Sequence, residues 1–373
     1  MKTSKVAMPP AGRAMRGITG FLLAGLLAGF APGGADPPAR TLRILGRAPL
    51  PTARSVARDI RWASADSVYV VHAFDGVSEV GLDGVKKRVM LPNSGQLRLS
   101  FYGHLAVSDQ NLAVTSRAFS VAWRPLKTSK DKSFQVKTLP FGVPEAMDLQ
   151  GDRILLLGMR HNVYLPEVPA NGEIAWLGTL SSGLDDLKPV FYDRSGPRLP
   201  TYRHCQGAAI GAARFLADGS FVIVPGFEKG VHLLSPAGRP LRSWKGEEIG
   251  ADSDCSGISD EQRKELVTKP AAWERWLNRH RIVDDVLPLP QGPGLLVRSW
   301  GESGQVYWQL KVLQGSRVET WTVPLIGQRP TDRLRGDVRA GRIAFLLSAS
   351  GFTGPPTESD PKGEIVVTEV PDE

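Results

Sequence analysis

Short apolar runs, each closed by turn residues, recur along most of the chain. Six of these runs are four residues long and rich in Val, Ile and Leu, and most of them follow a polar turn. Another apolar stretch precedes each run, so each pair predicts a β-hairpin. The six runs occupy residues 68–71, 112–115, 154–157, 221–224, 295–298 and 343–346.

The spacing of the runs predicts a closed ring of similar units. Their starts lie 44, 42, 67, 74 and 48 residues apart. Insertions predicted near 184–205 and 250–280 account for the two long gaps, and without them each unit has the roughly forty residues of a four-stranded blade. One blade cannot bury both of its faces, whereas six blades in a ring bury them against one another. We therefore expect an all-β fold, a six-bladed β-propeller with a short helical insertion. A seventh blade within 245–281 is the alternative.

The segment 214–244 shows the pattern of a single blade most clearly. Asp218-Gly219 predicts a tight hairpin turn, and Pro236-Ala-Gly238 predicts the next one. This segment resembles the blade of NHL-type and related, TolB-like, six-bladed propellers. It departs from them after the second strand, where NHL units usually carry Asp and Asn and this chain reads Pro225-Gly-Phe-Glu. The resemblance implies the architecture of residues 36–373 as one domain and implies no activity.

The two ends of the predicted ring are expected to meet. A strand-like stretch at 41–45 precedes the first unit, and the last unit ends with 364–370. In propellers the N-terminal strand often completes the final blade, and this pairing would remove an exposed sheet edge. We therefore expect 41–45 to lie in the same sheet as 364–370.

Residues 1–35 have the three parts of a secretory signal peptide. Four basic residues precede a 14-residue apolar run at 18–31, and a small-residue site ends at Ala35. The run is short for a bilayer span, so we expect cleavage after Ala35, with an uncleaved anchor as the alternative. Cleavage would lower the net charge from +8 to +4. The sequence therefore predicts an exported protein, periplasmic or extracellular, with no transmembrane segment in its mature form and no nucleic-acid partner.

The two insertions are expected to build one face of the propeller, because each joins the outer strand of one blade to the inner strand of the next. The first, 184–205, is rich in Pro, Arg and aromatic residues and is predicted to be a loop. The second, 250–280, is predicted to be helical, with Trp273, Trp276, Leu277 and His280 on one apolar face. We expect this face to pack on the propeller rim, and docking to a membrane or to a partner is the alternative.

The chain has two cysteines, Cys205 and Cys255, at the edges of the two insertions. In an oxidising compartment they would be able to form a disulfide that ties the insertions together. The alternative is two buried thiols that act as small apolar residues.

Acidic residues recur at the expected innermost strands, which line the central channel. Carboxylates that converge there would bind a hard cation such as Ca²⁺ or another divalent ion, as in some propeller lactonases. Alternatively, these side chains accept backbone N–H bonds and have a structural role. No other cofactor is expected. The candidates are Asp59, Glu145, Asp148, Asp284, Asp285 and Asp337.

The sequence contains no strong catalytic motif, such as GxSxG, HExxH or a P-loop. We therefore interpret the protein as a binding module that holds a small molecule, a glycan or a protein partner on the insertion face. A metal-assisted hydrolase or lyase of the lactonase type, with His104 or His204 as acid or base, is the alternative, and an envelope scaffold is a third. The binding candidates are His104, Tyr192, Arg194, Tyr202, Arg203 and His204.

Overall fold

The computed structural model divides the chain into two compact units, Met1–Pro38 and Ala39–Glu373, and every described residue lies in the second. The signal-peptide prediction therefore falls outside the described residues. Within the described part of the chain, no helix is long and apolar enough to cross a membrane. The described residues are 40–50, 56–73, 75–91, 103–116, 120–127, 134–139, 144–159, 173–192, 211–226, 230–251, 281–301, 304–329, 332–349, 363–371 and eight single positions within 261–280.

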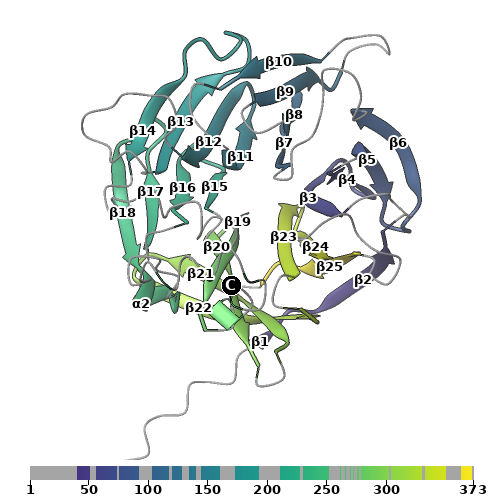
Figure 1. Cartoon of the computed structure of the whole chain (residues 1–373), viewed down its shortest axis with the longest axis vertical. Coiled ribbons are helices and arrows are strands. Elements are labelled where there is room, and N and C mark those ends of the chain that lie inside the picture. The colour runs from purple at the N-terminus through teal and green to yellow at the C-terminus, as the bar shows by residue number, and fades with distance from the viewer. Residues whose placement is uncertain are drawn as a thin grey trace, which may run out of the picture. The chain divides into compact units, whose positions relative to one another are not determined.

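Six sheets radiate from a common centre, and each supplies one blade (Figure 1). Blade 1 contains β3 (Ala57–Trp62), β4 (Ser67–His72), β5 (Gly76–Gly81) and β6 (Lys86–Leu91). Blade 2 contains β7 (Leu105–Val107), β8 (Asn111–Ser116), β9 (Ser120–Pro125) and β10 (Gln135–Thr138). Blade 3 contains β11 (Pro144–Gln150), β12 (Arg153–Met159), β13 (Glu173–Thr179) and β14 (Lys188–Tyr192).

The second half of the chain forms the other three blades. Blade 4 contains β15 (Ala212–Phe215), β16 (Phe221–Val224), β17 (Gly230–Leu234) and β18 (Pro240–Lys245). Blade 5 contains β19 (Ile282–Leu289), β20 (Gly292–Trp300), β21 (Val306–Gln314), β22 (Arg317–Gly327) and β1 (Arg40–Thr41). Blade 6 contains β23 (Asp332–Arg339), β24 (Arg342–Ala349), β25 (Glu364–Glu369) and β2 (Ile44–Pro49). The predicted six-bladed β-propeller is confirmed.

The apolar runs found in the sequence are the second strands of the six blades, from β4 to β24. The turns of blade 4 also follow the prediction. Gly219 has a φ of 83°, and the carboxylate of Asp218 accepts the Ser220 N–H at 3.0 Å. Gly238 has a φ of 82° in the next turn. Glycine adopts this left-handed backbone without a steric penalty, which explains why both hairpins close at these positions.

The ring closes through the N-terminal segment, as expected. β2 pairs antiparallel with β25, so the first part of the described chain completes the last blade. The strand begins at Ile44 and not at Thr41, because Thr41 belongs to β1, which pairs parallel with β22 in blade 5. Leu42 lies between the two strands with 4 % of its surface exposed.

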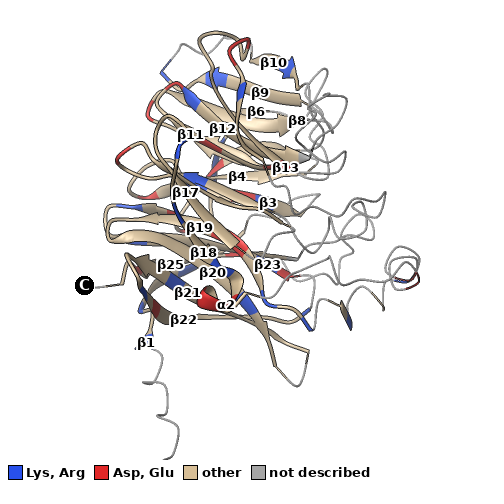
Figure 2. Ribbon diagram, turned by 90° about the vertical axis from the view of Figure 1, so that its left-hand side faces the viewer, with Lys and Arg blue, Asp and Glu red and all other residues tan. Residues whose placement is uncertain are grey.

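Apolar side chains fill each of the six interfaces between neighbouring blades. Among the described residues, six separate clusters of buried side chains do this, one for each pair of blades. Ile60 and Val68 of blade 1, for example, pack on Ala344 and Ile365 of blade 6. Both faces of every blade are therefore buried, which accounts for the almost continuous burial of the inner and second strands. Figure 2 shows that Lys, Arg, Asp and Glu are interspersed along the blades.

The first insertion is shorter than predicted. Residues 188–192, predicted to be part of a loop, form β14 and complete blade 3. The prediction failed because the prolines and charges around this strand resemble a loop, whereas Pro189 and Lys188 pair with Trp176 and Leu177 of β13. An outer strand tolerates such residues because one of its edges is free.

The described part of the second insertion contains helix, as predicted. α2 (Gly246–Ile249) follows β18, and Glu261, Glu265 and Ala272 are also helical. The ring of Trp276 stacks on His280 with 4.2 Å between centroids, and the His280 carbonyl accepts the indole N–H of Trp300 at 2.6 Å. These contacts join this part of the insertion to β20. Trp273 and Leu277 lie outside the described residues.

Candidate functional site

The innermost strands β3, β7, β11, β15, β19 and β23 each contact the inner strands of the neighbouring blades and surround the centre of the propeller. They bring an unusual number of charged side chains into the interior. A buried charge is costly unless it is paired and hydrogen-bonded, so the partners of these groups decide what the centre can do. The buried charged residues of these strands are Asp59, Arg61, Glu145, Asp148, Arg214, Asp284, Asp285, Asp332, Arg333 and Arg335.

Four of the predicted channel carboxylates hold neighbouring blades together. In each case one carboxylate oxygen accepts a backbone N–H from the inner strand of the following blade. The pairs are Asp59 with Leu105 (3.0 Å), Asp148 with Phe215 (2.8 Å), Asp285 with Gly336 (3.1 Å) and Asp337 with Trp62 (2.8 Å). This is the structural arrangement that the sequence left as the alternative to metal binding. Such bonds satisfy backbone donors that a propeller cannot pair within a blade.

Arg214, on blade 4, lies at the centre of these carboxylates and contacts three other blades. Its Nε donates to the Val286 carbonyl at 3.0 Å, and its Nη2 donates to the Gly336 carbonyl at 2.9 Å. The same Nη2 lies 3.2 Å from Asp285, and Nη1 lies 3.5 Å from Asp148. Burial disfavours the charged guanidinium, but the two carboxylates outweigh burial and raise its pKa above the ordinary value.

Arg61 forms a second buried ion pair, 2.6 Å from the Asp59 carboxylate. The same Nη1 donates to the Ile60 carbonyl at 2.5 Å. Burial would raise the pKa of Asp59, but Arg61 and then Arg214 hold that pKa below its usual value. The Nε of Arg61 is buried and makes no hydrogen bond to any described residue. Arg61 therefore keeps hydrogen-bonding capacity that no other described residue uses.

A further ionic cluster surrounds Asp284 near the start of β19. Its Oδ2 accepts the Trp308 indole N–H at 2.7 Å, and its carbonyl accepts Nη1 of Arg335 at 2.6 Å. Arg298 and Arg333 approach its Oδ1 at 3.8 and 3.9 Å. Burial, together with the neighbouring guanidinium groups, lowers the pKa of Arg333 to about 9, although Asp284 opposes this change. The cluster carries closely packed positive charge inside the protein.

His104 lies directly before β7 and is 7 % exposed. Its backbone N–H donates to the Thr115 hydroxyl at 2.8 Å, and its Nε2 is buried without a hydrogen bond to any described residue. Burial and the nearby Arg335 guanidinium lower its pKa to about 3, against the attraction of Asp59. The imidazole is therefore neutral at physiological pH. A role as general acid would require the protonated ring, which this environment disfavours.

A cavity of about 640 Å³ opens where the inner strands end. The last residues of β3, β11 and β23 and the turns that follow them line its wall, together with Leu126 and Lys127 of blade 2. Trp62, Phe215 and several aliphatic side chains make part of this wall apolar. We refer to this cavity as the channel-mouth pocket.

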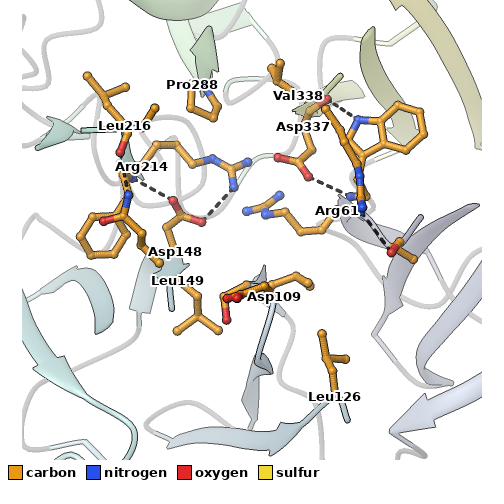
Figure 3. A pocket seen from close by; sticks show the side chains of 18 of the residues that line it. Arg61, Asp109, Leu126, Asp148, Leu149, Arg214, Leu216, Pro288, Asp337 and Val338 are labelled. Atoms are coloured by element: carbon orange, nitrogen blue, oxygen red, sulfur yellow. Dashed lines mark hydrogen bonds and ion pairs between the residues drawn. The ribbon is translucent and has the colours of Figure 1, made fainter. Parts of the chain in front are cut away.

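Arginine and aspartate side chains form the polar part of the channel-mouth pocket. Figure 3 shows the guanidinium groups of Arg61 and Arg214 directed toward one another between the carboxylates of Asp148 and Asp337. Burial raises the pKa of Asp148 and that of Asp337, although Arg214 and Arg61 oppose the change in both. The two carboxyl groups thus hold their negative charge less strongly than exposed aspartates do. The pocket therefore combines two guanidinium donors, Arg61 and Arg214, with two carboxyl groups whose pKa is raised, Asp148 and Asp337.

Sequence reasoning identified the aspartates of this site and missed its arginines. Arg61 follows Asp59 by two residues, and Arg335 precedes Asp337 by two. Because alternate residues of a strand point to the same face, this spacing places each arginine beside an aspartate on the channel side. That periodicity was the signal that would have found them.

The candidates on the insertion face are not brought together within the described residues. Tyr192 ends β14 and packs, half-buried, on the cluster between blades 2 and 3. The remaining residues lie outside the described part of the chain, so their roles stay predictions. They are Arg194, Tyr202, Arg203, His204, Cys205 and Cys255.

The described residues contain no group of three or more His, Cys, Asp or Glu side chains arranged to hold a metal ion. Glu145 lies near the start of β11 and is buried. A cation site in the channel stays a prediction from the sequence.

Comparisons with solved structures find propellers of low sequence identity among their matches. No protein-family model and no curated protein match the sequence. Virginiamycin B lyase from Staphylococcus aureus is 12% identical, with 87% of this chain and 98% of that chain covered and a TM-score of 0.42. Regucalcin, a calcium-binding protein from Agrobacterium tumefaciens, is 12% identical, with 89% and 96% covered and a TM-score of 0.45.

The WD40 β-propeller domain of Doa1 is 13% identical, with 87% of this chain and 96% of that chain covered and a TM-score of 0.43. At this level of identity the likeness concerns the fold alone, and propellers support many unrelated functions. The six sheets of the chain itself identify it as a six-bladed β-propeller.

Proposed function

We propose that this protein is an exported binding protein whose ligand occupies the channel-mouth pocket. The observation that carries the proposal is the cavity of about 640 Å³, which joins an apolar wall to the guanidinium groups of Arg61 and Arg214. Ligand pockets typically measure roughly 300–1,000 Å³ and combine apolar walls with a few convergent polar groups. The volume and the lining both support a small organic molecule as the ligand.

The proposal places the ligand away from the ends where the two insertions join the blades. The connections after β14 and β18 enter β15 and β19 at Ala212 and Ile282, the first residues of these strands. The channel-mouth pocket instead lies around Phe215 and Pro288, at the last turns of the same strands. A second binding face on the insertions, for a protein or glycan partner, remains part of the proposal on the strength of the sequence alone.

Export is the other part of the proposal. Cleavage after Ala35 would leave Asp36 as the first residue, close before β1. The ring would then keep both strands that the N-terminal segment supplies. N-terminal sequencing of the protein from the cell envelope or the medium should begin at Asp36, and a chain that begins at Met1 there would contradict cleavage.

A pocket-filling substitution tests the binding site. Ala217 is exposed in a turn and lines the channel-mouth pocket, so Ala217→Trp should fill part of the pocket at little cost to folding. Ala65 is exposed in the corresponding turn of blade 1 and does not line the pocket, so Ala65→Trp is the matched control. Small molecules that copurify with the wild-type protein, identified by mass spectrometry, should be retained by Ala65→Trp and lost from Ala217→Trp. Equal retention by both variants would reject the site.

Catalysis is a second candidate, favoured by one observation. Asp148 and Asp337 face the pocket, and burial raises the pKa of both carboxyl groups, as general acids require. A hydrolase or lyase that uses this pair would lose turnover and keep ligand binding in Asp337→Asn. If the ligand recovered from the wild-type protein is chemically unchanged after long incubation, the binding function stands alone.

A further inference from the structure

We infer that the channel-mouth pocket selects organic carboxylates, that is, molecules with an apolar body and one carboxylate group. The inference rests on the proposed function and adds the chemical class of the ligand. The carboxylate would lie beside the facing guanidinium groups of Arg61 and Arg214, and the apolar body would lie against the aliphatic wall.

The lining carries more positive than negative charge. Four of its side chains are cationic and three are carboxyl groups, and two of the three carboxyl groups are the buried Asp148 and the half-buried Asp337. Burial raises the pKa of both carboxyl groups, so they are protonated at a higher pH than an exposed carboxylate is. The remaining acid, Asp109, is exposed at the rim. At the deep end an anion would meet the guanidinium groups of Arg61 and Arg214, which already pair with Asp59 and Asp285, whereas a cation would be repelled by them.

The deep end also contains a donor that no described residue accepts from. Arg61 is 4 % exposed, its Nη1 bonds to Asp59 and to the Ile60 carbonyl, and its Nε has no hydrogen-bond partner among the described residues. A buried donor left without a partner destabilises the empty site, and a ligand oxygen that accepts a hydrogen bond from this guanidinium would offset that cost. Guanidinium matches carboxylate in geometry as well as in charge.

The rim and the wall complete the selection. Lys127 and Arg339 are exposed at the opening, where they would attract an anion during its approach. The wall also presents Leu126, Leu149 and Phe215, whose side chains offer no hydrogen bonds to a polar body. The arrangement therefore fits one charged group followed by an apolar group.

Matched probes test this selection. The probes are 3-phenylpropionate, its primary amide and 3-phenylpropylamine, with the same triplet on naphthyl and octyl bodies, titrated into the purified protein by calorimetry. We expect each acid to bind at least tenfold more tightly than its amide, and the amine to bind most weakly. If an amide or an amine binds as tightly as its acid, the inference fails while the proposed pocket stands. If no probe of any charge binds, the proposed function fails together with the inference.

Two variants test which residues cause the preference for acids. Arg61→Gln should reduce acid binding at least tenfold and leave amide binding within twofold. The double variant Lys127→Gln and Arg339→Gln changes only exposed rim residues, so it should fold normally, bind the acid about threefold more weakly and show a smaller salt dependence. The double variant still tests the inference if Arg61→Gln does not fold. Arg317→Gln, an exposed substitution on β22 outside the pocket, is the control and should bind as the wild type does. Unchanged acid binding in the rim variant would overturn the inference.

Discussion

At the scale of single residues, the centre of this propeller is held by ion pairs and by carboxylates that bind backbone N–H groups. Arg214 shows how one buried charge connects several blades. Its guanidinium contacts residues of blades 3, 5 and 6 while its own strand belongs to blade 4. Replacement of the whole network by apolar residues would be tolerable, but removal of one partner leaves a buried charge without compensation.

We expect Arg214→Met to destabilise the fold by about 3–5 kcal/mol, because Asp148 and Asp285 would remain buried without their cation. Arg317 pairs with Glu319 on the surface, and Arg317→Met should cost less than about 1 kcal/mol. Urea unfolding followed by circular dichroism gives both free energies. Similar small losses in the two variants would show that the central network is not required for stability.

His104 should make stability depend on pH. Its pKa is about 3 in the folded protein and 6.5 for the free side chain, because burial and Arg335, together with Arg61 and Arg333, oppose the charged ring more than Asp59 favours it. Between these two values the unfolded chain binds a proton that the folded chain does not. The contribution of His104 to stability is therefore fully present above pH 6.5 and falls as the pH decreases toward 3.

The comparison of wild type with His104→Gln isolates this effect, since all other groups titrate in both proteins. From pH 6.5 to pH 5 the wild type should lose about 2 kcal/mol more of its free energy of unfolding than the variant does. Chemical denaturation at a series of pH values measures the difference. Parallel pH profiles would mean that His104 is not held neutral.

At the scale of strands, the N-terminal segment closes the ring through two separate pairings, β1 with β22 and β2 with β25. Leu42 lies between these strands and packs into the core shared by blades 5 and 6, and its N–H donates to the Thr322 carbonyl at 3.0 Å. Leu45, three residues later, is 45 % exposed. The two leucines therefore differ in burial within the same closing segment.

Leu42→Ala should cost about 2–4 kcal/mol, because it leaves a cavity beside the strands that close the ring. Leu45→Ala should change the free energy of unfolding by less than about 0.5 kcal/mol, as exposed substitutions usually do. Equilibrium denaturation of both variants measures this contrast. Equal effects at the two positions would indicate that the segment is not docked as described.

The strands of the blades were largely predictable from the sequence, because apolar runs and turn residues are local signals. The six second strands and the turns at Gly219 and Gly238 follow directly from them. β14 was missed because its contacts with β13 outweigh a composition that is typical of loops.

At the scale of the whole molecule, the ring explains why the candidate site was only half predicted. The aspartates were found because they recur in the inner strands, but Arg214 has partners that lie 66 to 122 residues away in sequence. No local pattern predicts which blade faces which across the centre, and hence which charges pair. The channel-mouth pocket forms from the ends of several inner strands, so it exists only after the ring has closed.

The most direct test of the central claim uses Trp62 as a reporter inside the pocket. Its indole N–H donates to the Asp337 carbonyl at 3.0 Å and lines the site, whereas the Trp308 indole donates to Asp284 outside it. In ¹H–¹⁵N spectra of the protein titrated with the tightest-binding acid probe, we expect the Trp62 indole signal to shift and the Trp308 signal to stay in place. A bound probe that leaves the Trp62 signal unmoved would contradict the assignment of this pocket as the ligand site.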